Sequence, residues 1–238
     1  MNKNLEVSLI MGQSWSVFKA HWLMLSLILM AVMFVSVMVS FLNPYQVPVG
    51  LEGEALIEWY IENGASYYAW SLLAAGVQVV LMAWFFKEIF KRIKGVEPVF
   101  NSGVVLRYVG VSLIVGIATY AAAFCCIIPV FFIAPRLFIA PLYVIDNPDM
   151  GVGEAIERSW NATKGNVGNL LVLGIVAMLI GILGVCCCLI GVVPASVLTY
   201  TMMVVIYLFL SGQDGEDKAA DDYEEVSFVV EEKTVCRD

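Results

Sequence analysis

Six stretches of the chain are long, apolar and almost free of charged side chains. Five contain no Asp, Glu, Lys or Arg, and each is long enough to cross the roughly 30 Å hydrocarbon core of a bilayer as a helix. The sixth is shorter and carries Arg136 between Pro135 and Pro141, so a re-entrant or broken helix stays open as an alternative to a full crossing. The pattern predicts an all-α, polytopic transmembrane bundle within residues 22–211. We place its six spans at residues 22–42, 67–86, 108–128, 130–145, 167–189 and 192–210.

Turn-forming residues divide these predicted spans into three hairpins. Pro129 separates the third span from the fourth, and Gly191 with Pro194 separates the fifth from the sixth. So few residues are left for these two connections that both must be tight. The first hairpin has a longer connection, residues 43–66, which is acidic.

The basic residues orient the predicted spans. Nine of the ten that precede the C-terminal tail fall on one side of the membrane, which the preference of Lys and Arg for the cytoplasmic face makes the inside. Loop 43–66 has four Glu and no Lys or Arg, so it is predicted to lie outside. We therefore expect a protein of the cell membrane with both termini and a basic loop at 87–107 in the cytoplasm. The nine are Lys3, Lys19, Lys87, Lys91, Arg92, Lys94, Arg107, Arg158 and Lys164.

Two amphipathic segments, residues 1–21 and 151–165, share the pattern S-W-x-x-x-K and each precedes a long apolar run. Apolar residues recur in both at spacings of three and four, which predicts two helices lying at the cytoplasmic surface of the membrane. Residues 87–101 resemble a degenerate third copy, so the chain reads as an internal repeat of a surface helix followed by a hairpin. Interfacial anchors are expected at Trp15, Trp22 and Trp160, with Lys19 and Lys164 reaching toward anionic lipid head groups.

Composition supports lipid as the surrounding medium. Hydrophobic residues make up 61% of the chain and charged residues 14%, against roughly 45–50% and 25% in soluble domains. The net charge of −8 arises in residues 212–238, which hold ten of the 21 acidic and three of the 13 basic residues. We expect this tail to be disordered, with docking on a partner as the alternative. Nucleic acid is excluded as a partner, because binding phosphate requires a basic surface.

Arg136 is the strongest candidate for a functional side chain. A charge within a span is costly, so it is expected to have a partner or a water-filled cavity. One hypothesis is that Arg136 binds an anionic group, such as a lipid phosphate or a substrate carboxylate. The other is that it snorkels or pairs within the protein. The polar residues expected to partner it, or to line a cavity with it, are Asp146, Glu157, Asn169 and Thr199.

Five cysteines cluster at the predicted outer ends of spans. They occur as a pair and a run of three, each shortly before a hairpin proline. Three interpretations stay open: small apolar packing residues, a disulfide between the clusters, or a thiolate metal site. Neighbouring residues on a helix point about 100° apart, and the spacing is not that of a zinc site, so no metal is predicted. The cysteines are Cys125, Cys126, Cys186, Cys187 and Cys188.

The most specific stretch of the sequence runs from Arg136 to Asn166. It reads R-L-F-I-A-P-L-Y-V-I-D over residues 136–146 and G-E-A-I-E-R-S-W-N-A-T-K-G-N over residues 153–166. This arrangement resembles a group of bacterial six-span proteins of poorly defined function, which includes the membrane domain beside some glycerophosphodiester phosphodiesterases and the YciC-like and DUF975-like proteins. The resemblance implies a membrane module. It does not imply the hydrolase activity, which belongs to a separate soluble domain of those relatives.

No catalytic motif of a known kind occurs in the chain, so we predict no enzyme and no cofactor. The first functional prediction is an integral membrane module without catalysis, serving envelope or membrane homeostasis or a membrane complex. The alternative is a transporter or lipid-binding protein that uses a cavity around Arg136. The expected partners are the lipid bilayer, anionic lipid head groups, and another membrane protein or a second copy of the chain.

Overall fold

The computed structural model describes residues 5–125, 133–186 and 188–214, and every regular element within these ranges is helical. Residues 133–137 are helical in addition to the named helices. The predicted all-helical fold with several long apolar helices is therefore confirmed. The named helices are α1 (Val7–Phe41), α2 (Glu54–Lys94), α3 (Ser102–Cys125), α5 (Ala140–Asp146), α6 (Val152–Ala162), α7 (Val167–Cys186) and α8 (Cys188–Asp214).

Five helices within the described residues are long and apolar enough to cross a membrane, not six. They are α1, α2, α3, α7 and the Gly191–Gly212 part of α8. The predicted fourth span is divided, because a turn at residues 138–139 separates the helical residues 133–137 from α5. Seven helical residues rise only about 10 Å, a third of the hydrocarbon core. The count of six spans is therefore not confirmed.

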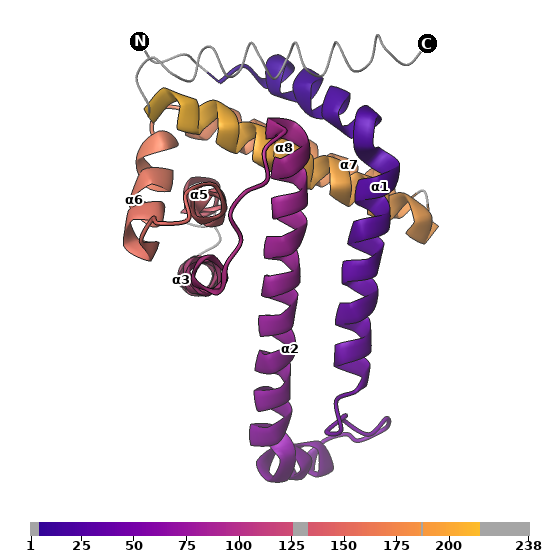
Figure 1. Ribbon diagram of the computed structural model, residues 1–238. Helices are drawn as coiled ribbons and strands as arrows, with labels where there is room; N and C mark the ends of the chain where they lie inside the picture. The colour runs from indigo at the N-terminus through magenta and orange to yellow at the C-terminus, as the bar shows by residue number, and fades with distance from the viewer. Residues whose placement is uncertain (1–4, 126–132, 187, 215–238) are drawn as a thin grey trace.

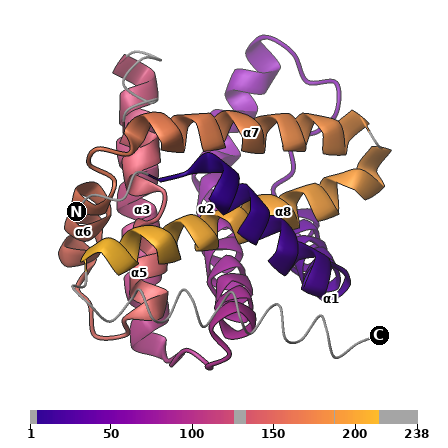
Figure 2. The same cartoon turned by 90° about the horizontal axis from the view of Figure 1, so that it is seen from above.

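The long helices do not form one parallel bundle. Figure 1 shows α2 and the second half of α1 running side by side down the view, while α7 and α8 run across their upper ends. In Figure 2, after a quarter turn, α3 lies along the view's vertical and α2 is seen nearly end-on. The helices thus point along three directions. Contacts between α1 and α8 and between α7 and α8 hold the assembly together.

The first helix has no break where the sequence suggested one. We expected a surface helix over residues 1–21 and a separate span from residue 22. Instead α1 runs unbroken from Val7 to Phe41, and its first turns bury Ile10, Ser14 and Val17. These turns pack on α8, so the N-terminal segment is part of the folded body and not a detached surface element.

Glycine positions explain two local features. α2 continues through its basic last turn to Lys94 and stops at Gly95, whose φ of +70° is the left-handed conformation common after helices. Three cations in that turn also suit the negative end of the helix dipole. At Gly184 an added Cβ would lie 2.7 Å from the Cβ of Ala195. α7 and α8 can therefore approach closely only with glycine there.

The outer faces of the long helices are apolar. Phe41 and Leu72 expose 72% and 73% of their surface, and Met178 exposes 67%. In water such surfaces would be unfavourable by about 25 cal/mol per Å². Lipid removes this cost, so the exposed faces are compatible with a membrane protein.

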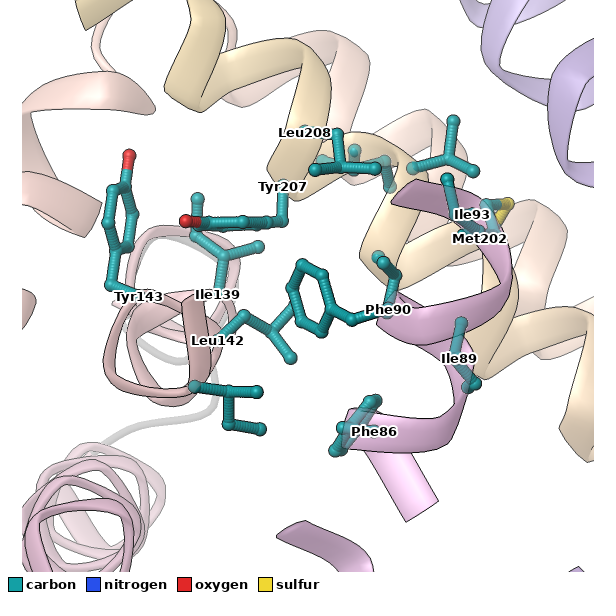
Figure 3. Close-up of a cluster of buried hydrophobic side chains, with 14 of the residues drawn as sticks. Phe86, Ile89, Phe90, Ile93, Ile139, Leu142, Tyr143, Met202, Tyr207 and Leu208 are labelled. Carbon is teal, nitrogen blue, oxygen red and sulfur yellow. The ribbon is translucent and has the colours of Figure 1, made fainter. Parts of the chain in front are cut away.

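The densest part of the core lies where the end of α2 meets α5 and α8 (Figure 3). The ring of Tyr207 contacts those of Tyr143 and Phe90 edge-on, with centroid separations of 4.8 and 5.5 Å. Ile139 and Leu142 fill the space between these rings. This cluster fixes the position of the segment that carries Arg136.

Candidate functional site

The segment around Arg136 is shaped by its prolines. Pro141 stands in the first turn of α5 and has no N–H to donate, so the helical hydrogen bonding of residues 133–137 does not continue through it. The carbonyl of Arg136 accepts a hydrogen bond from Ser159 Oγ at 2.5 Å. This bond joins the segment to α6, 23 residues further along the chain.

The guanidinium of Arg136 lies over the ring of Trp160, 4.5 Å from its centroid. Stacking of a cation on an aromatic face is worth about 0.5–2 kcal/mol, more as water is excluded. Arg136 Nε is buried and has no hydrogen-bond partner among the described residues. The structure thus gives Arg136 an aromatic partner that the sequence analysis did not assign, since it treated Trp160 only as an interfacial anchor.

Asp146 is not the partner of Arg136. Its carboxylate accepts hydrogen bonds from Lys94 Nζ at 2.6 Å and from the Tyr207 hydroxyl at 2.8 Å. The end of α2, the end of α5 and α8 therefore meet at one carboxylate. Glu157 is exposed on α6 and forms no ion pair with Arg136 in the described structure. Both predicted pairings of Arg136 are therefore wrong. In the case of Asp146, packing brings Lys94, 52 residues away in the sequence, to the carboxylate.

Asn169 bonds to the N-terminal segment and not to Arg136. Its Nδ2 donates to the carbonyl of Leu5 at 2.7 Å, and Leu5 N–H donates to Asn166 Oδ1 at 3.0 Å. Leu5 itself is buried. Two side chains at the start of α7 thus hold both backbone groups of one residue ahead of α1. Sequence reasoning missed Asn166 and Leu5, although two asparagines three residues apart at a helix start were a visible signal.

The remaining predicted residues make contacts of their own. Lys19 is exposed on α1, and Lys164 Nζ donates to Asn161 Oδ1 at 2.7 Å. Thr199 Oγ1 donates back to the carbonyl of Ala195 within α8 at 3.0 Å. Trp15 is half exposed and stacks on Phe18. Trp22 is half exposed too, and the placement of these tryptophans at a membrane surface stays a prediction.

Only one of the five clustered cysteines has a described side chain. Cys186 is exposed and free, so a disulfide between the clusters, one of the three interpretations left open, would not include it. The side chains of Cys125, Cys126, Cys187 and Cys188 lie outside the described residues. Within the described ranges, no group of His, Cys, Asp or Glu is arranged to hold a metal ion.

Two cavities lie between helices. One, of about 430 Å³, is apolar and lies between residues 134–138, α7 and α8; Thr199 and Tyr200 are among its lining residues. Arg136 is not among its described lining residues, so this cavity is not the one around Arg136 that was expected for a transporter. The other cavity, of about 560 Å³, lies between α1 and α2 and is lined largely by uncharged polar side chains.

Comparison with known proteins adds no identification. No family model, no curated protein and no solved structure matches the chain. The resemblance of residues 136–166 to the six-span bacterial group therefore stays a prediction, and function has to be argued from the geometry.

Proposed function

We propose that the chain is an integral membrane module without catalytic activity, which serves envelope or membrane homeostasis or a membrane complex. The observation that carries this proposal is the use of its inward polar side chains. Asp146, Ser159 and Asn169 each hydrogen-bond to another segment of the same chain. A catalytic or transport site needs such groups free for a substrate, whereas these groups hold segments together.

The proposal includes six crossings, with residues 130–145 as a short sixth and both termini in the cytoplasm. Five crossings would place the two termini on opposite sides of the membrane. The distribution of Lys and Arg favours an even number, because the segment before α1 contains Lys3 and the residues after α5 contain Arg158 and Lys164. A bacterial inner membrane, anionic lipid head groups and a second copy or another membrane protein as partner belong to the same proposal.

Proteoliposomes test the absence of transport. We expect Arg136→Gln and Ser159→Ala to lower thermal stability, with Glu157→Gln as the matched exposed control on α6. Neither variant should change the flux of ions, small solutes or labelled lipids, because the wild type should show none above protein-free liposomes. Flux by the wild type that Arg136→Gln abolishes without loss of stability would contradict the proposal.

A second candidate function, lipid binding, is supported by the apolar cavity. Its lining includes Ile175 and Met178, which are themselves half or more exposed, so the cavity opens to the medium around α7. Such a space suits an acyl chain, and since Arg136 is not in its wall, a phosphate would not be held there. Native mass spectrometry should show retained lipid that Ala177→Trp displaces, while Leu179→Trp, on the exposed face, leaves it bound. Equal retention in both variants would rule this site out.

A further inference from the structure

The polar cavity between α1 and α2 is unlike the rest of the membrane-compatible surface. Along this pair of helices the outward residues are large and apolar, such as Phe34, Phe41 and Leu72. The inward seam carries Ser36 and Ser40 from α1, and Ser71 and Gln78 from α2. This arrangement, with apolar side chains outside and polar ones inside, is the reverse of that in a soluble helix pair. It gathers hydrogen-bonding groups in one half-open cavity.

Small residues create the space. Ser36, Ser71, Ala74 and Ala75 lie where larger side chains would fill the seam. The loop after α1 borders one end of the cavity through Asn43, Gln46 and Val47. The resulting volume of about 560 Å³ lies within the roughly 300–1,000 Å³ range of small-molecule sites.

Some polar side chains of the lining form hydrogen bonds within the protein, and others do not. Trp70 Nε1 donates to the carbonyl of Val39 at 3.1 Å, which fixes the orientation of its ring. Gln46 Nε2 donates to the Phe41 carbonyl at 3.0 Å, and its Oε1 stays available as an acceptor. The side chains of Ser40, Tyr67 and Gln78 make no hydrogen bond to other described residues.

The chemistry of the lining selects the ligand. No Asp, Glu, Lys, Arg or His lines the cavity, so neither an anion nor a cation would find a counter-charge. The remaining groups are amides and hydroxyls, which present donors and acceptors together. A ligand hydroxyl does both at once, and the rings of Trp70 and Tyr67 offer apolar faces for C–H groups.

We propose that this cavity binds an uncharged polyhydroxyl group of about the size of a sugar ring, which is either a free sugar or the head group of a glycolipid. Gln78 supplies hydrogen bonds from within the helix pair, Ser40 and Tyr67 add hydroxyls, and Trp70 provides the stacking face. The site goes beyond the proposed membrane module, since its lining residues come from α1, α2 and the loop between them and do not include Arg136 or Asp146. Figure 1 shows α5 on the other side of α2 from α1.

The test uses the full chain in lipid nanodiscs and two sources of the same chemistry. Glucose and maltose are titrated by calorimetry, and a monoglucosyl diacylglycerol is offered in the nanodisc and followed by native mass spectrometry. Glucuronate serves as the charged counterpart. We expect saturable binding of the sugars, the glycolipid, or both, and at least tenfold weaker binding of glucuronate.

Two variants and a control locate the site. Gln78→Leu removes the amide with little change of volume, and Ala74→Phe fills the space; each should weaken binding at least tenfold. Leu72→Ala, on the lipid-facing side of the same helix, should leave binding unchanged. Absence of saturable binding, equal affinity for glucuronate, or unchanged binding in Gln78→Leu would overturn the proposal. The proposal would also be overturned if the chain formed dimers that Gln78→Leu abolished, because a second copy of the chain would then occupy the cavity.

Discussion

Individual polar side chains act as joints between segments that are distant in the sequence. Asp146 is the clearest case, since it accepts from α2 and from α8 at the same carboxylate. Its side chain is 18% exposed and that of Lys94 36%, so solvent screens this pair only in part. The pair of Glu154 and Arg158 has a similar length of 2.8 Å, but both side chains are about half exposed.

The difference in exposure predicts a difference in stability. Asp146→Asn should lower the free energy of unfolding by about 1–3 kcal/mol, because the Lys94 ammonium loses its charged acceptor. Glu154→Gln, the matched control, should cost less than about 0.5 kcal/mol. Thermal unfolding in detergent measures both, and a double-mutant cycle with Lys94→Gln isolates the pair. Equal costs for the two substitutions would argue against the joint.

The sequence could identify Arg136 but not its surroundings. A charged residue inside an apolar run is visible in the sequence itself, and this observation alone identified Arg136. Its partner depends on which helices pack together, and Asp146 seemed closest only in sequence. Trp160 had an alternative role at the lipid interface, and its stacking on Arg136 needs the fold to be seen. Asn166, Lys94 and Tyr207 escaped notice for the same reason.

At the scale of elements, the N-terminal segment is held by the start of α7. Asn169→Ala should free the Leu5 carbonyl and loosen the segment ahead of α1. Hydrogen exchange at the Leu5 amide should then become faster, as local opening becomes easier. Asn161→Ala is the control, because that side chain bonds only to exposed Lys164. Unchanged exchange in Asn169→Ala would show that packing alone holds the segment.

The loop after α2 carries a pH-dependent contact. Hydrogen bonds from Lys87, and then from Lys91, hold the pKa of Glu97 below its ordinary value of 4.5. The stabilisation is therefore complete above pH 4.5 and is lost as the pH falls through the lowered pKa. We expect Glu97→Gln to lower the melting temperature slightly at pH 7, by an amount that shrinks as the pH falls through the lowered pKa. A difference that did not change with pH would point to a packing effect.

Helix boundaries show what hydropathy can and cannot locate. The predicted second span ends at residue 86, where charged residues begin, yet α2 continues to Lys94. Charge does not stop a helix, because backbone hydrogen bonding continues and Lys or Arg stems reach outward. Gly95 stops it by adopting a positive φ. For α6 the predicted range, residues 151–165, is close to the observed Val152–Ala162.

At the scale of the whole molecule, apolar length predicted the long helices but not their directions. Crossing angles follow from side-chain fit, for example from the close contact of Gly184 with Ala195, and no periodicity along the chain encodes that fit. The three directions in Figures 1 and 2 could not have been anticipated in this way. The division of the fourth span, in contrast, was one of the two alternatives that its prolines left open.

Orientation in the membrane is open to a direct test. A reporter active only outside the cytoplasm should work when inserted in the acidic loop at residues 50–53, between α1 and α2. The same reporter fused after residue 214 should be silent, since six crossings return the chain to the cytoplasm. Activity at both positions would mean five crossings, and silence in the loop would invert the topology.

The packing of α1 on α8, with Leu5 bonded to a residue 164 positions later, has a consequence for biosynthesis. During synthesis α1 leaves the ribosome well before α8, which is one of its native neighbours, has been made. At about 5–20 residues per second, that interval is roughly 8–33 s. Throughout it the seam of α1 that bears Ile10, Ser14 and Val17 has no native cover. We expect insertion machinery to cover this seam in the meantime. A stop codon before α8 would leave the seam of α1 uncovered, where quality-control proteases can recognise it.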